Sequence, residues 1–583
     1  MLKNRPRFLA RFFIVLILLI VVRLFYWQVI KSKELHTLAQ SQHLSQTTVT
    51  PNRGKILTSD NFPLVFNEPR YRLFAYVPNL NLSPQKLVDL LLQRLDFQID
   101  DPVVATDPAK LKTTLERTKE IFATKVLQRL TTKKWVPLAR DLSLQEKEAL
   151  QTDNLKGLSF QETFKRYYPE ASMAAHLLGF VGKDKLGHPK GFYGLEGYYD
   201  RELRGTESII QQENDALGNP LLTTSFHSVL GKDGRDLKLY LDRSLQFQVE
   251  QALRQGLKLY GAKSGEVVVM DPYTGGILAM ASLPSYDPAK YWLYDTSLYK
   301  NPVIANTYEP GSTFKVLVMA AALQEKVVKP EDHCDICGAP VKIGKYTIRT
   351  WDNKYQAGRT PEEILVHSDN VGMVWVQRRL GDDKFLEYLH KFGFGQKTNI
   401  DLQEEIAAPL KKHWSEIDYA TAAFGQGIAV TSIQMVRAVA AIANGGNLVE
   451  PHVVHQVIGQ DTQTIKPKVV RRVIDPETAK TLTQMMVASA EHGEAKWTAL
   501  KEYQVAGKTG TAQIPVAGHY DPEKTIASFI GFAPADHPRF VMLVKLREPQ
   551  TSPWGSETAA PLWFHLAKKI LIHLNVPPSL PTH

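Results

Sequence analysis

The chain has 583 residues, of which 44% are hydrophobic and 22% charged, with a formal net charge of +10. A single core stops growing at roughly 250–300 residues, so two or more domains are expected. The composition excludes a disordered chain and a multi-span membrane protein. No run of cations is interleaved with aromatic residues, so we expect no nucleic-acid partner.

The N-terminus has the pattern of a membrane anchor. Residues 1–11 carry four cations and no acid, and residues 12–30 are apolar except for Arg23 and Gln28. Residues 12–30, at ~1.5 Å each, extend about 28 Å, close to the ~30 Å of a bilayer core. The alternative is a cleaved signal peptide with its apolar region at 12–22, but no small-residue cleavage site follows. We favour an uncleaved single span that leaves 1–11 in the cytoplasm and everything after the span outside.

Residues 31–235 have a mixed pattern, which we interpret as an elongated N-terminal pedestal domain. Helices are predicted at 84–96, 108–131 and 143–151. The glycine-rich segment 191–197 lacks the strand-to-helix context of a phosphate loop, so we interpret it as turns.

From residue 236 the pattern becomes that of a more regular domain. A helix, two strand pairs and a last helix are predicted, in this order, at 244–260, 266–280, 527–546 and 557–574. Strands at both ends with helices between them are typical of an α+β layer architecture. The predicted fold class is therefore α+β, with an antiparallel sheet flanked by helices in a domain at 236–576.

The two cysteines, Cys334 and Cys337, form a single Cys-x-x-Cys pair. A structural zinc ion needs four ligands, and His333 makes at most three. We therefore expect a local disulfide or two free thiols here, and no metal site.

The segment at Ser312 has the groups that acyl transfer needs. Ser312 and Lys315 are three residues apart, and an apolar helix is predicted over 316–324. Residues three apart lie on one helix face, so the Lys315 amine can reach the Ser312 hydroxyl as its base. Because a lysine base must be neutral, Lys315 requires a pKa lowered by burial or by a second cation.

Two further elements complete a set, Ser368-Asp369-Asn370 and Lys508-Thr509-Gly510. Short patterns recur by chance, and decoys of the first two elements start at Ser59, Ser83 and Ser297. Only the segments at 312, 368 and 508 follow one another in a consistent order along the chain, with the first at a predicted helix, the second in a loop and the third on a strand. We therefore predict that these three segments converge.

Each of these residues also has an ordinary structural interpretation. Ser368 and Asn370 could cap a helix at 371–380. The strand residues Lys508, Thr509 and Thr511 could be ordinary members of a sheet. His367 is expected to pack rather than to act in catalysis, and Arg349 and Trp351 are weaker candidates for the walls of a cleft.

The ordered set resembles the S-x-x-K, S-D-N and K-T-G motifs of penicillin-binding proteins and related β-lactamases. The segments 308–315, 423–427 and 507–513 resemble a class B penicillin-binding protein, and 53–56 and 194–197 resemble its pedestal. Glu309-Pro310 is more similar to the division type than to the elongation type. Departures from the family pattern at 59–62 and 301–302 affect the subtype more than the chemistry.

The resemblance implies a serine-type peptidoglycan D,D-transpeptidase that cross-links stem peptides through an acyl-enzyme on Ser312. It implies that Lys315 is the base, that Ser368 relays a proton with help from Lys508, and that Asn370 binds the substrate backbone. It assigns oxyanion stabilisation and substrate binding to Thr509, Gly510 and Thr511. No metal or organic cofactor is implied.

The implied partners are stem peptides, β-lactam antibiotics, a membrane-embedded glycosyltransferase, and division or elongation proteins. Two alternatives remain open. One is a D,D-carboxypeptidase or β-lactamase-like hydrolase, which the retained pedestal disfavours. The other is a catalytically inactive membrane scaffold, which the intact triple set disfavours.

Overall fold

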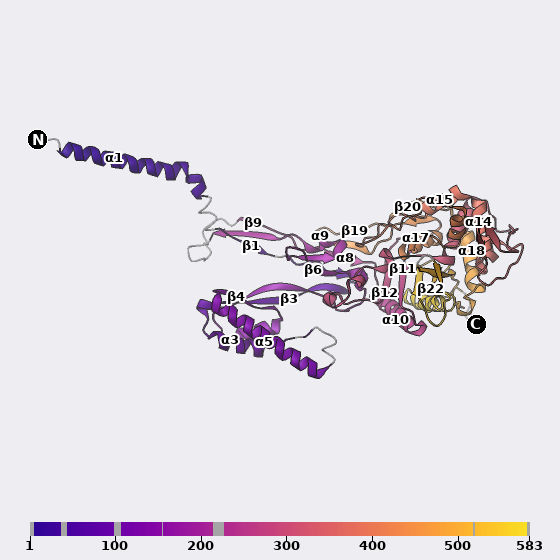
Figure 1. The fold of residues 1–583 in the computed structure, drawn as a ribbon, viewed down its shortest axis with the longest axis horizontal. Coiled ribbons are helices and arrows are strands. Elements are labelled where there is room, and N and C mark those ends of the chain that lie inside the picture. The colour runs from indigo at the N-terminus through magenta and orange to yellow at the C-terminus, as the bar shows by residue number, and fades with distance from the viewer. Residues whose placement is uncertain are drawn as a thin grey trace. The chain divides into compact units, whose positions relative to one another are not determined.

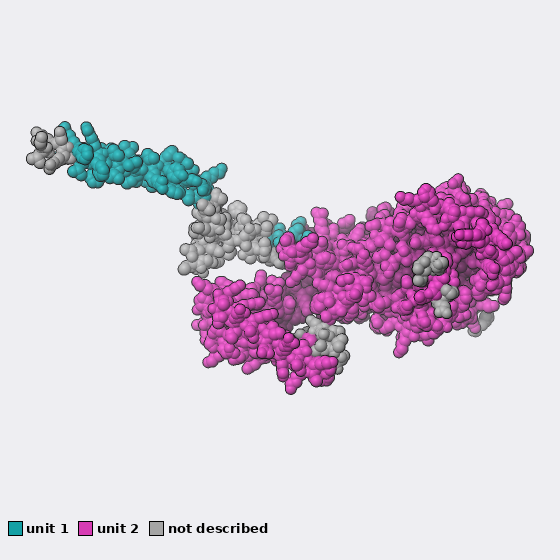
Figure 2. Space-filling view, in the orientation of Figure 1, with its two compact units in different colours: residues 1–53, 204–234 teal, residues 54–203, 235–583 magenta. Residues whose placement is uncertain are grey.

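The computed structural model describes residues 5–36, 44–49, 51–97, 99, 107–153, 155–213, 227–516 and 519–579 (Figure 1). The chain forms two compact units, one of residues 1–53 with 204–234 and one of residues 54–203 with 235–583 (Figure 2). The functional division of the chain into 31–235 and 236–576 stays a prediction.

The first unit contains the apolar N-terminal helix. The helix α1 (Arg5–Phe25) continues into the π-helical turn η1 (Tyr26–Ile30). In the described part of the chain, Pro6–Ile30 is the one helix long and apolar enough to cross a membrane, with a mean hydropathy of 2.7. The Arg23 guanidinium lies 5.9 Å from the Tyr26 ring centroid and 5.2 Å from that of Trp27. The unit also contains a three-stranded antiparallel sheet of β1 (Leu44–Val49), β8 (Ser208–Glu213) and β9 (His227–Val229).

The second unit begins with a seven-stranded sheet that joins distant parts of the sequence. Six of its strands lie side by side in the order β19 (Gln463–Thr464), β18 (Val454–Ile458), β10 (Asp236–Leu239), β2 (Ile56–Leu57), β3 (Pro63–Tyr76) and β4 (Trp135–Leu142). The seventh strand, β5 (Leu158–Tyr167), pairs with β3. The segments 54–203 and 235–583, which residues 204–234 separate in the sequence, therefore share one hydrogen-bonded sheet.

Three helices pack on β3 and β4 of this sheet: α3 (Pro84–Arg94), α5 (Pro108–Thr132) and α6 (Leu144–Thr152). They confirm the predicted helices to within two residues at each end. Each begins at a side chain that accepts a hydrogen bond from the first turn, namely Ser83, Asp107 and Ser143. Such N-caps satisfy backbone donors that the helix itself leaves unpaired, which is why these helices begin where they do.

The interpretation of 191–197 as turns alone is wrong. The segment contributes to the hairpin of β6 (Phe180–Lys183) and β7 (Pro189–Phe192) and to the helix α8 (Gly194–Tyr198). A Cβ on Gly194 would lie 2.4 Å from the Leu177 carbonyl oxygen, and the φ of Gly194 is +45°. Glycine is required there because the start of α8 packs against the backbone at the end of α7 (Ala175–Leu178).

The predicted α+β fold is confirmed in the rest of the second unit. A five-stranded antiparallel sheet has the order β12 (Ile277–Leu283), β11 (Ser264–Met270), β23 (Phe540–Arg547), β22 (His519–Ala533) and β21 (Ala506–Val516). One face is covered by α10 (Arg243–Tyr260) and α19 (Ala559–His573), and the other by α17 (Ser432–Ala443) and α18 (Pro476–His492). Successive residues of β11 enter the two cores in turn, as strand alternation requires.

The remaining elements are short helices and two-stranded sheets. The helices are α7 (Ala175–Leu178), α9 (Asp200–Arg204), α11 (Pro302–Ala305), α12 (Lys315–Gln324), α13 (Pro361–Val366), α14 (Asn370–Leu380), α15 (Asp382–Lys391) and α16 (Glu416–Ala422). The two-stranded pairs are β13 (Thr307–Tyr308) with β16 (Val430–Thr431), β14 (Val341–Ile343) with β15 (Tyr346–Ile348), and β17 (Asn447–Val449) with β20 (Val469–Arg472). The buried Cys334 and Cys337 are joined by a disulfide with an S–S distance of 2.06 Å.

Candidate active site

Ser312 lies on the short 3₁₀ turn η5 (Gly311–Phe314), which leads directly into α12. Residues three apart eclipse each other on a 3₁₀ turn, so Ser312 and Lys315 share one side of the chain more closely than on an α-helix. The Ser312 side chain is half-buried, whereas Lys315 is fully buried. Ser312 and Lys315 therefore occupy neighbouring positions at the start of α12, and their roles as nucleophile and base stay predictions.

The Lys315 amine joins the first motif to the second. Its Nζ donates hydrogen bonds to the Ser368 carbonyl oxygen at 2.5 Å and to Asn370 Oδ1 at 2.8 Å, and it lies 3.3 Å from Ser368 Oγ. Ser368 has a φ of +54°, a strained left-handed conformation that turns the chain sharply before α14. Asn370 is held from its other side, because its Nδ2 donates to the Arg349 carbonyl oxygen at 3.0 Å.

The helix cap at this turn is Asp369, and the interpretation of Ser368 and Asn370 as caps is wrong. Asp369 Oδ1 accepts hydrogen bonds from the backbone N–H groups of Val371 at 2.9 Å and Gly372 at 3.1 Å. Its Oδ2 accepts from Arg359 Nη1 at 2.7 Å, and both side chains of this pair are buried. Because Asp369 satisfies the helix terminus, Ser368 and Asn370 remain available to Lys315.

The third motif lies on β21, the edge strand of the five-stranded sheet. The Lys508 side chain is 1% exposed, and its Nζ donates to Thr509 Oγ1 at 3.0 Å. The Thr509 hydroxyl in turn donates to Glu494 Oε2 at 2.7 Å. The Thr511 hydroxyl accepts from the Gly555 N–H at 2.9 Å, which leaves its own proton free for another acceptor.

Close packing brings β21 against the turn that carries Ser312. A Cβ on Gly510 would lie 2.7 Å from Thr313 Cγ2 and 3.0 Å from the Pro310 carbonyl oxygen. A Cβ on Gly311, whose φ is +55°, would lie 3.0 Å from the Thr511 carbonyl oxygen. Glycine at both positions lets the two segments approach, so the three predicted segments converge.

The electrostatics of the cluster lower the pKa values of its lysines. The pKa of Lys315 is lowered to about 7, mainly by burial and also by the positive charge of Lys508, while Asp369 and Glu494 partly oppose the shift. Burial also lowers the pKa of Lys508, and Glu494 again opposes the change. A substantial fraction of Lys315 is therefore neutral at neutral pH, as a base requires.

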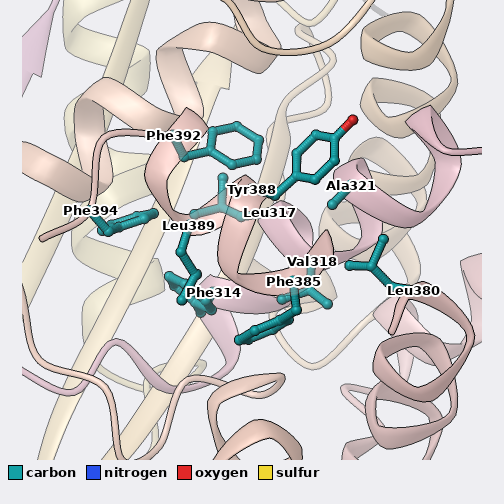
Figure 3. A pocket seen from close by; sticks show the side chains of 10 residues that line it. All are labelled: Phe314, Leu317, Val318, Ala321, Leu380, Phe385, Tyr388, Leu389, Phe392 and Phe394. Atoms are coloured by element: carbon teal, nitrogen blue, oxygen red, sulfur yellow. The ribbon is translucent and has the colours of Figure 1, made fainter. Parts of the chain in front are cut away.

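An apolar cavity of about 10 Å³ lies where α12 packs against α15 (Figure 3). Its lining includes Phe314 and Leu317 from the nucleophile segment, with Phe385 and Leu389 from α15. This volume is at the lower limit for a single water molecule, and all the lining side chains are apolar or aromatic. The helix that positions Lys315 thus rests on a nearly close-packed support.

Some nearby residues differ from the expectation or carried no sequence pattern. His367 is exposed, so the prediction that it packs is wrong; its carbonyl oxygen accepts from Trp351 Nε1 at 3.2 Å. The exposed Trp351 faces the ring of Trp554, with centroids 5.4 Å apart. Sequence reasoning did not single out Glu494, Arg359 or Gly555, because each lies in a loop outside the motif that it contacts and belongs to no pattern of its own. Among the described residues, no three His, Cys, Asp or Glu side chains form a cluster that could hold a metal ion.

Two family models match the chain. Residues 265–571 match the penicillin binding protein transpeptidase domain, and residues 48–239 match the penicillin-binding protein dimerisation domain. The chain belongs to the class B penicillin-binding proteins. The first match contains the three motifs described above, and the second covers most of the predicted pedestal.

Curated relatives and solved structures agree with this assignment. Stage V sporulation protein D of Bacillus subtilis (strain 168) is 33% identical over 592 residues, which cover 99% of this chain and 86% of that protein. Peptidoglycan D,D-transpeptidase FtsI of Buchnera aphidicola subsp. Baizongia pistaciae (strain Bp) is 28% identical over 589 residues, which cover 99% of this chain and 96% of that protein. Penicillin Binding Protein 2X from Streptococcus thermophilus has the same fold, with a TM-score of 0.75, 24% identity, and coverage of 91% of this chain and 80% of that one.

Proposed function

We propose that this penicillin-binding protein is a serine-type peptidoglycan D,D-transpeptidase with Ser312 as its nucleophile. The Ser312 oxygen attacks the carbonyl carbon between the two terminal D-alanines of a stem peptide, and the Lys315 amine takes the hydroxyl proton. The C–N bond then breaks, and the departing D-alanine amine receives a proton through the Ser368 hydroxyl. An amine of a neighbouring strand next attacks the ester carbonyl, forms the cross-link and releases Ser312.

The buried amine of Lys315 is the observation that carries this proposal. It contacts the hydroxyl and carbonyl of Ser368 and the amide oxygen of Asn370 at the same time. A hydroxyl beside a lysine whose pKa is about 7 has a direct path for its proton. Asn370, which is held from both sides, is placed to bind the backbone amide of the stem peptide.

The side of the site formed by β21 supplies the contacts for the negative charges of the substrate. We assign the terminal carboxylate of the donor peptide to Lys508 and to the free proton of Thr511. The backbone N–H groups of Ser312 and Thr511 are assigned to the developing oxyanion, and one such donor contributes about 10²–10³ in rate in other acyl transferases. Two features support these roles: the Gly510 contact holds β21 against the nucleophile turn, and β21 has no further strand on its outer side.

Covalent labelling by a fluorescent penicillin tests the site. The wild-type chain and Ser297→Ala are expected to be labelled alike, because Ser297 lies in an exposed decoy of the Ser-x-x-Lys pattern. Ser312→Ala is expected to carry no label, and a peptide digest of the labelled wild type is expected to place the label on Ser312. Equal labelling of Ser312→Ala and wild type would refute the site. Rapid release of the label with turnover would instead indicate a hydrolase.

We also infer the placement of the chain in a bacterial plasma membrane. Residues 12–30 are assigned as the span, 1–11 as the cytoplasmic tail, and the predicted pedestal and transpeptidase domains to the outer side. The apolar helix Pro6–Ile30 and the cations before it support this topology. Its test is labelling of single engineered cysteines before and after the span by an impermeant maleimide in intact cells.

The proposed partners supply the other half of wall synthesis. Residues 48–239 match a dimerisation domain and 265–571 a transpeptidase domain, so we assign the glycan strands to a separate membrane-embedded glycosyltransferase. The Glu309-Pro310 pair and the similarity to an FtsI protein support a role at division. A tagged copy is expected at the septum, and a distribution along the side wall would assign the chain to elongation.

A further inference from the structure

We propose that Glu494 is a positioning residue of the acyl-transfer site, which acts through the Thr509 hydroxyl to hold Lys508 in place and to keep it charged. Glu494 lies two residues after the end of α18 and belongs to none of the three motifs. The inference rests on the proposed function, because that function assigns the substrate carboxylate to Lys508.

A directed chain of hydrogen bonds connects the three side chains. The Lys508 ammonium can only donate, so Thr509 Oγ1 accepts from it at 3.0 Å. The single hydroxyl proton of Thr509 then points the other way, to Glu494 Oε2 at 2.7 Å. The hydroxyl is thus fixed between a cation and an anion, and its own proton is not available to a substrate carboxylate.

Lys508 has a particular need for such a connection. Its side chain is 1% exposed, and its other hydrogen-bond contact is the Thr509 carbonyl oxygen at 3.4 Å. Within the described residues no carboxylate lies within ion-pair distance of its ammonium group. Burial without an anion favours the neutral amine, which could not hold a carboxylate. Glu494 is the negative charge that raises the pKa of Lys508 against this effect.

The same charge also reaches the base. Lys508 of β21 is the second cation near Lys315 of α12, and its positive charge raises the cost of charging Lys315. Asp369 also raises the pKa of Lys315, but its charge is shared with Arg359. Other titratable side chains on the neighbouring elements or in the loops beside them include Glu309, Arg349, His367, Glu491, His492 and Lys524.

The sign of the effect follows from these contacts. Glu494 raises the pKa of both lysines, so removing its charge lowers both. The base Lys315 then becomes neutral at a lower pH, which moves the acidic limb of the acylation profile down. Lys508 also loses its proton at a lower pH, which moves the alkaline limb down in the same direction.

The experiment measures the rate of Ser312 labelling by a fluorescent penicillin across the pH range, with the full chain in detergent. In Glu494→Gln, which keeps an acceptor for Thr509 but loses the charge, both limbs are expected to move to lower pH. At alkaline pH the variant is expected to be labelled roughly tenfold more slowly than wild type. The matched control is Glu491→Gln, which removes the same charge three residues away and is expected to keep the wild-type profile.

A double-mutant comparison tests whether Thr509 carries the effect. Thr509→Val is expected to slow labelling, and adding Glu494→Gln to it is expected to change the rate little further, because the connection is already broken. Independent, multiplying losses would contradict the relay. If Glu494→Gln fails to fold, the pH profile of labelling is measured on Glu494→Asp, which keeps the charge. Acidic and alkaline limbs at the wild-type pH support the role of the charge, and shifted limbs contradict it.

The outcomes separate this inference from the proposed function. A Glu494→Gln profile that superimposes on that of wild type, with labelling on Ser312 intact, overturns the role of Glu494 alone. A merely structural role would lower the melting temperature without moving either limb. If the wild-type chain carries no label on Ser312, the proposed function itself fails.

Discussion

The buried ion pair between Arg359 and Asp369 is expected to determine whether the second motif forms. Arg359 and Asp369 are 7% and 0% exposed, and the nitrogen and oxygen atoms are 2.7 Å apart. Arg359→Met removes one partner and leaves a buried carboxylate, a change that costs about 3–5 kcal/mol in such pairs. Because Asp369 keeps two backbone N–H donors, we expect the lower end, about 3 kcal/mol.

The assay combines thermal unfolding with penicillin labelling of the full chain. A loss of about 3 kcal/mol lowers the melting temperature by roughly 4–5 °C in a domain of this size, because the unfolding entropy is about 2.1 cal/mol/K per residue. The labelling rate is expected to fall too, because Asp369 holds the turn between Ser368 and Asn370. Arg378→Met is the matched control: its ion pair with Glu416 is 43% and 69% exposed, so a change below about 1 kcal/mol is expected.

A double substitution separates the interaction energy of the Arg359–Asp369 pair from the effect of each side chain alone. Arg359→Met with Asp369→Asn is expected to be less destabilising than the two single changes added together, because the second removes the charge that the first left unpaired. The reasoning is refuted if Arg359→Met melts within about 2 °C of wild type and is labelled at the wild-type rate.

Three further predictions follow from the site. Acylation of wild type is expected to rise about tenfold from pH 6 to pH 8, because Lys315, with a pKa of about 7, acts only when neutral. Lys315→Arg should abolish acylation at every pH, and a flat pH profile in stopped-flow labelling would contradict the role of Lys315 as the base. Gly510→Ala is expected to slow labelling about 10²-fold by displacing β21 from the nucleophile turn, because its Cβ would lie 2.7 Å from Thr313; Gly338→Ala, whose Cβ meets nothing nearer than 3.3 Å, is the control, and equal rates would refute the contact. Leu317→Ala is expected to enlarge the apolar cavity and to lower the free energy of unfolding by about 2–5 kcal/mol. An unchanged melting temperature would show that the side chains around the cavity close the space.

Local pattern was enough to predict the elements that carry the site. The spacing of Ser312 and Lys315, the apolar helix after them, and the strand that contains Lys508 are all short-range features of the sequence. The structure places the three segments together, although their chemical roles stay predictions. The turn η5 differs in detail from the predicted helix start, because a 3₁₀ turn and an α-helical turn have the same apolar spacing over four residues.

Long-range partners were not predictable in the same way. Glu494 and Arg359 are polar residues in loops, where polar residues are ordinary, and only the fold brings them to Thr509 and Asp369. Which residue caps the helix at the second motif was not predictable either, because serine, aspartate and asparagine are all good N-caps and local pattern sets no order among them. The pairing of β2 with β10 also has no local pattern, since each strand is short.

The seven-stranded sheet limits how the protein can be cut into pieces. Strand β10, at the start of the predicted transpeptidase domain, lies between β2 and β18, and its Leu237 and Leu239 are fully buried. A fragment that starts at residue 236 would lose β2 and expose one side of β10 as a bare edge, a template for aggregation. A soluble fragment is therefore better designed by removing the N-terminal helix alone, and a protease nick near residue 234 should leave both halves bound together.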